Sequence, residues 1–106
     1  MQQSKASTPR HYHWTTHEGI DDGGISTGIG FTISWQRGTI QAADHNGAHL
    51  IDVIDACINR LEHFQEGKLA DNHNETALKH LHAARQELWR RRAGRAAAVT
   101  LDTHKV

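Results

Sequence analysis

The sequence has 106 residues, enough for one domain with a single small hydrophobic core. Apolar residues make up only 37% of it, so assembly into oligomers is a natural way to bury more surface. The 12 basic and 12 acidic side chains cancel to a net charge of zero, which argues against a general polyelectrolyte binder. The single cysteine, Cys57, excludes an internal disulfide, and we expect it to be buried. Because no stretch resembles a membrane span or a signal peptide, we expect a soluble, cytoplasmic protein.

The first part of the chain has the pattern of a small antiparallel sheet within residues 10–40. His11–His17 is rich in aromatic and β-branched residues and predicts a strand, and residues 19–24 are turn material. Residues 29–36 alternate apolar with small or polar side chains, which predicts a second, half-buried strand. Gly28-Ile29-Gly30 precedes this strand rather than a helix, so it predicts a turn and not a phosphate-binding loop.

After Asn46-Gly47 the apolar spacing changes to three and four residues, which predicts an amphipathic helix that Gly67 can close. A second helix begins after Asp71 or Asn72 as its N-cap. The expected fold class is α+β, with a small N-terminal antiparallel sheet followed by a long antiparallel helical hairpin. The expected organisation is a disordered tail over residues 1–9 and one domain over 10–106, made of a sheet over 10–40, a first helix over 47–66, a second helix over 71–97 and a tail over 98–106.

An arginine cluster in the second helix is the strongest functional signal. Five arginines and one acid lie between Arg85 and Arg95, and residues 79–106 carry a net charge of +5 against −5 for residues 41–78. At about 100° per residue, the apolar stripe continues into Arg91, Arg92 and Arg95, and Arg91 and Arg95 project beyond the expected end of the shorter first helix. Arginines at i and i+4 suit phosphate oxygens, so the pattern favours an anion site. A solvated helix end is the alternative.

Neither the ten histidines nor the other polar residues predict a metal or catalytic site. His45 and His49 have an i, i+4 spacing, but His45 lies in the loop before the helix. His80 and His82 point to different faces of theirs. We therefore expect surface histidines, no cofactor and no enzyme, because no nucleophile, base and orienting group can be assembled from the spacing.

Four motifs carry a resemblance to a known family. They are Gly28–Gly38; Asn46-Gly47-Ala48 with Asp52-Val53 and Arg60-Leu61; Asn74, Ala77-Leu78, His80-Leu81 and Ala84; and Arg91, Arg95 and Thr103-His104-Lys105-Val106. Over about residues 25–106, the sequence resembles the first family of phage Thoeris anti-defence proteins, whose helical-hairpin domain is shared with anti-CBASS sponges. Where that family has a glycine-rich stretch before the last motif, this chain has Ala96-Ala97-Ala98.

The resemblance implies a non-catalytic sponge in the cytoplasm of the infected bacterial host. Such proteins sequester cyclic ADP-ribose isomers (glycocyclic ADP-ribose) made by TIR-domain proteins, and some hold cyclic di- or trinucleotides at a second site. The family assembles as dimers or hexamers. A nucleic-acid-binding module that uses the ridge Arg85–Arg95 is the main alternative, although the net charge opposes it. An enzyme that degrades the signal and a purely structural hairpin are two further alternatives.

By position, the resemblance implies four ligand contacts. Phe64 would stack on adenine, Asn74 would bind a base or ribose edge, and Arg91 and Arg95 would clamp the pyrophosphate. Three further candidates are Arg92, Thr103 and His104. Because Asn74 and Arg91 are about 25 Å apart along a helix, one chain cannot bring both to one ligand. Two antiparallel chains can, so we expect the site between the protomers of a dimer.

Overall fold

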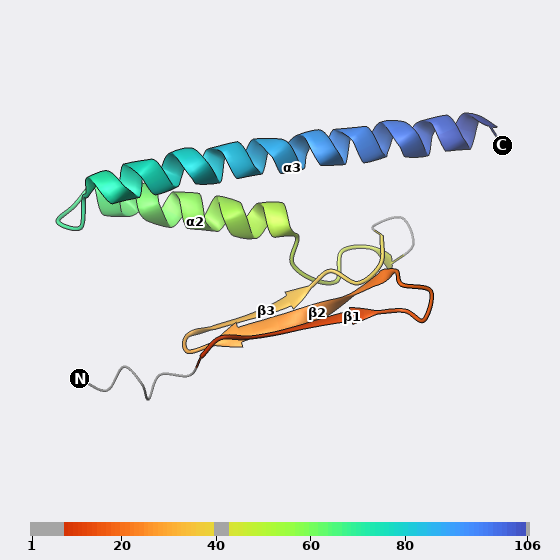
Figure 1. Cartoon of the computed structure of the whole chain (residues 1–106), viewed down its shortest axis with the longest axis horizontal. Helices are drawn as coiled ribbons and strands as arrows, with labels where there is room; N and C mark the ends of the chain where they lie inside the picture. The colour runs from red at the N-terminus through yellow and green to blue at the C-terminus, as the bar shows by residue number, and fades with distance from the viewer. Residues whose placement is uncertain (1–7, 40–42, 106) are drawn as a thin grey trace. The chain divides into compact units, whose positions relative to one another are not determined.

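The computed structural model describes the backbone of residues 8–39 and 43–105 and the side chains of residues 8–39 and 43–94. The described part of the chain forms two compact units that divide between Leu50 and Ile51. The first unit contains three strands, and the second contains two helices (Figure 1). This arrangement confirms the predicted α+β class. No helix among the described residues is long and apolar enough to cross a membrane.

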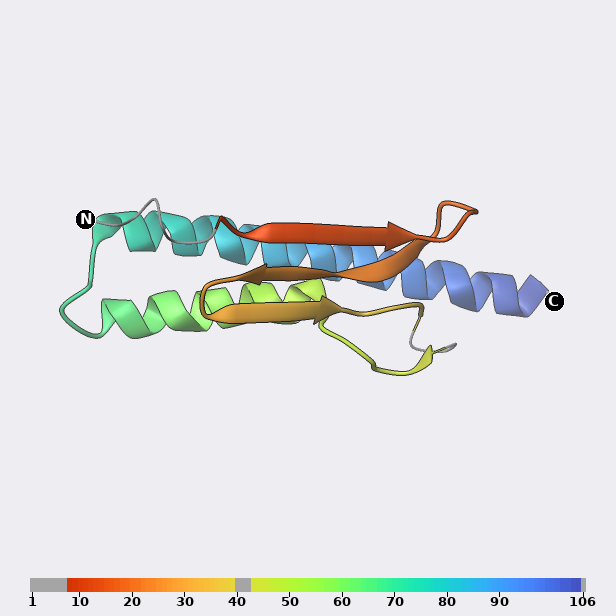
Figure 2. The same ribbon diagram turned by 90° about the horizontal axis from the view of Figure 1, so that it is seen from below.

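The three strands form one antiparallel sheet in the order β1-β2-β3 (Figure 2). Their bounds are Arg10–Thr15 for β1, Asp21–Gly28 for β2 and Phe31–Trp35 for β3. At the centre, Ser26 is only 5% exposed, and its hydroxyl accepts the indole N–H of Trp35 at 2.9 Å. The same hydroxyl lies 3.0 Å from Nδ1 of His11, so one small polar group joins the three strands.

Strand β2 is a correction to the sequence prediction, which assigned residues 19–24 to a turn. The turn is shorter: the amide of Thr16 donates to the carbonyl of Ile20 at 2.8 Å, and the chain then enters β2 at Asp21. Glycine is needed at position 24 because β1 packs closely against β2 there, and not because the chain turns. A Cβ at Gly24 would lie 2.0 Å from the carbonyl oxygen of Tyr12, so only glycine lets β1 approach at this irregularity. The predicted turn at Ile29-Gly30 is confirmed, with Gly30 at a φ of +83°.

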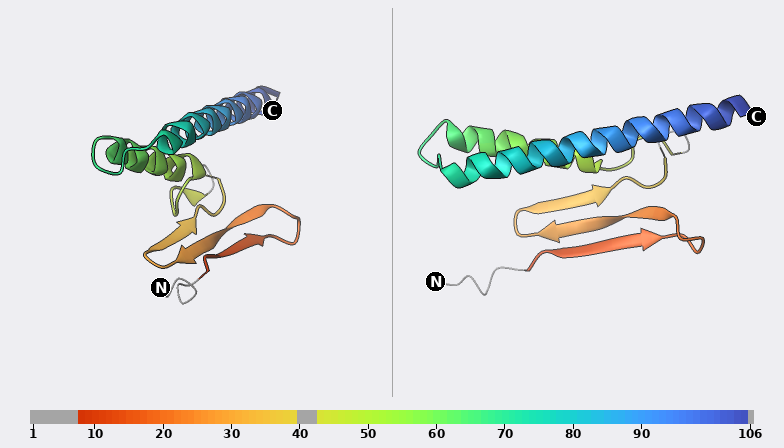
Figure 3. Two further views of the ribbon diagram at one scale, coloured as in Figure 1. Left: turned by 60° about the vertical axis from the view of Figure 1, so that its left-hand side comes forward. Right: turned by 45° about the horizontal axis from the view of Figure 1, so that its top comes forward.

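The helices form the predicted antiparallel hairpin (Figure 3). Helix α2 spans Leu50–Gln65 and α3 spans Asn72–Lys105. Asp71 is the N-cap of α3, because its Oδ1 accepts the amide of His73 at 2.6 Å. Helix α3 does not end near Ala97, and residues 98–105 are helical rather than a tail. A single glycine in a helix costs only about 1 kcal/mol, and the run Ala96–Ala98 has the highest helix propensity.

Burial on α2 is concentrated at two isoleucines. Ile51 and Ile58 are 7% and 3% exposed, and they are the only buried hydrophobic residues in the described part of the chain. Cys57, which we expected to be buried, is exposed. It lies about 100° around the helix from Ile58, outside the buried stripe.

This difference predicts contrasting effects of two adjacent substitutions. Ile58→Val should lower the free energy of unfolding by about 1 kcal/mol, because it leaves a small cavity on a buried face. Cys57→Ala should change it by less than about 0.5 kcal/mol. Urea unfolding monitored by circular dichroism measures both. Equal losses would contradict this prediction and show that Cys57 is covered in solution.

Candidate functional site

The turn of the hairpin carries an aromatic ring surrounded by basic groups. Phe64 is half-buried in the last turn of α2, with the guanidinium carbon of Arg60 at 5.2 Å from its ring centroid and the ring of His63 at 6.5 Å. A shallow hollow of about 140 Å³ lies beside it. Its lining residues are Arg60, His63, Phe64, Gly67, Lys68 and Leu69. Since a cation over an aromatic face also attracts anions and π systems, this hollow suits a flat, negatively charged molecule.

Asn74 lies at the start of α3 and holds the turn closed. Its Nδ2 group donates to Oε1 of Gln65 at 2.9 Å and to the carbonyl of Leu69 at 2.8 Å. Both amide hydrogens are therefore engaged within the hairpin, and only Oδ1 is left to accept a hydrogen bond. Asn74 can still contact a ligand, but as an acceptor rather than as the paired donor and acceptor that we expected.

The arginines of α3 differ in whether they already contact another side chain of the hairpin. Arg85 forms an ion pair with Asp55 across the hairpin, and Arg90 pairs with Glu87 at 2.5 Å. Arg92 stacks on Trp89, with its Cζ 5.0 Å from the ring centroid.

Arg91 differs from these neighbours. It is exposed and makes no ion pair, hydrogen bond or ring contact with any described side chain. An anion can therefore reach its guanidinium without displacing any described side chain. The side chains of the other candidates Arg95, Thr103 and His104 lie outside the described residues.

Two contacts fix the register of the hairpin. Gln65 meets Asn74 near the turn, and Asp55 meets Arg85 further along. In antiparallel helices these pairs place Leu50, the first residue of α2, level with about Arg90. By this register α3 extends beyond α2 from about Arg91 onward. Figures 1 and 3 show the C-terminal part of α3 running past the start of α2. The arginine cluster therefore continues past the end of the shorter helix, as the sequence predicts.

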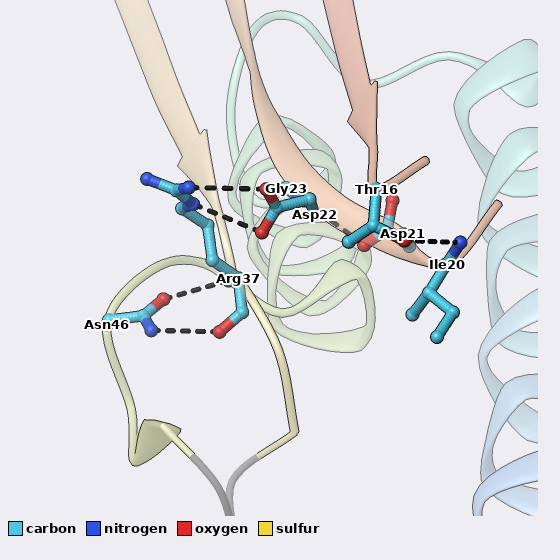
Figure 4. Close-up of polar contacts among 7 residues, drawn as sticks. All are labelled: Thr16, Ile20, Asp21, Asp22, Gly23, Arg37 and Asn46. Atoms are coloured by element: carbon cyan, nitrogen blue, oxygen red, sulfur yellow. Dashed lines mark hydrogen bonds and ion pairs between the residues drawn. The ribbon is translucent and has the colours of Figure 1, made fainter. Parts of the chain in front are cut away.

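A second hollow, which the sequence did not predict, lies in the sheet unit. It measures about 550 Å³ and is lined by Asp22, Arg37, Gly38, Ala43 and Asn46. The Arg37 guanidinium faces the Asp22 carboxylate at 3.3 Å, and the Asn46 side chain binds both backbone groups of Arg37 (Figure 4). No sequence signal could have located it, because Asp22 was assigned to a turn. Its two charged groups neutralise each other, so it carries less attraction for an anion than the hairpin does.

The geometry is that of a small-anion-binding protein. A helical hairpin with a basic, aromatic hollow at its turn, and near its other end an exposed guanidinium that pairs with no described side chain, is suited to bind nucleotide-like anions. Comparison with known families matches residues 28–93, more than half of the chain, to the family described as Acb2/Tad1, hairpin domain. The chain belongs to this family of anti-CBASS and anti-Thoeris sponges, which confirms the resemblance. A comparison with curated proteins gives no match.

Membership in this family establishes the general activity. Its members are phage anti-defence proteins that bind and sequester cyclic nucleotide signals, and they are not enzymes. The match begins at Gly28, the last residue of β2, and ends in α3 just after Arg92. It therefore includes Phe64, Asn74 and Arg91, while β1 and most of β2 lie outside it.

Proposed function

We propose that this protein sequesters glycocyclic ADP-ribose in the cytoplasm of the infected bacterium and thereby inhibits Thoeris immunity. The observation that carries the proposal is the state of Arg91: beside arginines with internal partners, it is exposed and has no partner among the described side chains. A pyrophosphate presents paired oxygens that match the guanidinium fork. Phe64 offers a face for adenine, and Oδ1 of Asn74 can accept a hydrogen bond from the adenine amino group.

The proposed site lies between two chains. Asn74 and Arg91 belong to one continuous helix and are about 25 Å apart along it, which exceeds the length of a cyclic ADP-ribose. In an antiparallel dimer, the turn of one chain would face the arginines of its partner, and two-fold symmetry would give two equivalent sites. The net charges of −5 and +5 on the middle and end of the chain favour this pairing. Hexamers would be assembled from such dimers.

The main alternative function is less well supported. A nucleic-acid-binding ridge would need several free cations, but Arg85 and Arg90 are paired with acids. A second site for cyclic di- or trinucleotides is compatible with the family and is tested by the same titration.

Binding without turnover is the direct test of the proposal. Calorimetric titration with glycocyclic ADP-ribose should give tight binding, and the ligand released by heating the complex should co-elute with the starting material on chromatography. Release of a hydrolysed product would show an enzyme and contradict sequestration. If cyclic di- or trinucleotides bound and glycocyclic ADP-ribose did not, the proposed ligand would be wrong while the family assignment would stand.

A further inference from the structure

Two histidine rings meet in the loop between β3 and α2. Nδ1 of His45 lies 3.0 Å from Nε2 of His49, the ring centroids are 5.1 Å apart, and the ring planes are nearly perpendicular at 81°. His45 is exposed and His49 is half-buried. No other two histidines in the described ranges have ring nitrogens in hydrogen-bonding contact. The sequence spacing could not show this, because the segment between them is not helical.

The backbone on both sides of each ring is held in place. The side-chain amide of Gln36 donates to the carbonyl of Asp44 at 2.6 Å, and its oxygen accepts the amides of Asn46 at 2.9 Å and Gly47 at 3.2 Å. The amide of Ala48 donates to the carbonyl of Ser34 in β3 at 2.7 Å. The backbone that carries the two rings is therefore held at the end of the sheet.

We propose that His45 and His49 form a chelating site for one divalent transition-metal ion. Two imidazole nitrogens bound at right angles to one ion at 2.0–2.1 Å would be separated by about 2.8–3.0 Å. The observed 3.0 Å matches this separation. Imidazole nitrogens suit Ni²⁺, Cu²⁺ and Zn²⁺, and affinity rises from Ni²⁺ to Cu²⁺ in the usual order, so Ni²⁺ and Cu²⁺ are suitable probes of the site.

Binding of the ion requires only that one proton moves within a histidine ring. The hydrogen bond between the rings needs a proton on one of the two facing nitrogens. When the ion binds, that proton moves to the other nitrogen of the same ring by exchange with water. Each ring then turns about χ2, a soft torsion, so that both lone pairs point to the ion. The described residues contain no group of three or more metal-binding side chains, so the remaining coordination positions are open to water or an anion.

Titration of the untagged full chain with Ni²⁺ alone, at neutral pH in a non-chelating buffer, tests the site. We expect one ion per chain, with affinity reduced by at least about tenfold in His45→Ala and equally in His49→Ala. His80 is exposed on α3 and has no ring partner among the described residues, so His80→Ala is the matched control and should bind as the parent does. Unchanged binding in His45→Ala, or similar small losses in all three variants, would overturn the proposal in favour of adventitious surface binding.

A second measurement separates loss of the site from loss of the fold. Without metal, both variants should unfold near the parent's midpoint temperature, and added Ni²⁺ should raise that midpoint only in the parent and in His80→Ala. Cu²⁺ bound to the parent should show coupling to two imidazole nitrogens in its electron paramagnetic resonance spectrum. One nitrogen, or none, would contradict chelation. Because neither histidine belongs to the proposed nucleotide site, these outcomes do not depend on the ligand assigned above.

Discussion

Replacing Arg91 by alanine is expected to weaken binding of glycocyclic ADP-ribose by about 2–5 kcal/mol, because a phosphate charge would lose its partner in a partly buried site. This corresponds to a loss of affinity from about thirtyfold to several thousandfold. The effect should be large because Arg91 makes no contact with the described residues that the ligand would have to replace. Calorimetric titration of the variant measures the loss directly.

Arg90→Ala is the matched control for this experiment. It removes the same charge from the adjacent position of the same helix, but Arg90 is already paired with Glu87. Its loss should stay within the range of exposed ion pairs, about 1 kcal/mol or less. If both variants bound equally weakly, the effect would come from the overall charge of the helix end. If both bound as the parent does, Arg91 would not be a ligand contact. Arg95→Ala, one helical turn further on, should behave like Arg91→Ala.

The hairpin was predictable because its signals are local and periodic. Apolar residues at steps of three and four define α2, and an aspartate before the second periodic run defines the N-cap at Asp71. The register also follows, since a short antiparallel connection leaves the longer helix to extend beyond the shorter one. What spacing could not give was the end of α3, because Gly94 and the following alanines are compatible with either helix or tail.

The central strand was missed because its glycines have a tertiary cause. Asp21-Asp22-Gly23-Gly24 has the composition of a turn, yet Gly24 is needed where the backbone of Tyr12 approaches. No local pattern reports an approach between strands. The same limit applies to Cys57, whose apolar neighbours predicted burial although its place on the helix exposes it.

For the candidate site as well, the sequence shows the residue types but not their contacts. The arginine cluster is visible as composition, but its members become distinct only through their partners: Asp55 for Arg85, Glu87 for Arg90 and Trp89 for Arg92. The engagement of both Asn74 amide hydrogens within the turn is likewise a three-dimensional property. Residue types thus indicated a place for anions, and contacts indicate which group is free to bind one.

Mixing two inactive variants gives the sharpest test of a site shared between chains. Phe64→Ala should remove the stacking face and Arg91→Ala the phosphate contact, so each variant alone should have no intact site. A mixed dimer contains one chain of each variant. One of its two sites combines both substitutions, and the other is intact because it takes Phe64 from the Arg91→Ala chain and Arg91 from the Phe64→Ala chain. Random pairing makes half of the dimers mixed, so co-refolded variants should recover about a quarter of the parent's binding capacity at full affinity.

The outcome distinguishes a site shared between chains from a site within one chain, because mixing changes the number of intact sites and not the affinity of each. A site within one chain would gain nothing from mixing, since every chain would still carry a defect in its own site. The control is the double variant Phe64→Ala/Arg91→Ala co-refolded with the parent, which should retain about a quarter of the sites if they are shared between chains and half if they are not. Recovery in the first mixture together with a quarter in the second would establish that Phe64 and Arg91 act on one ligand from opposite protomers.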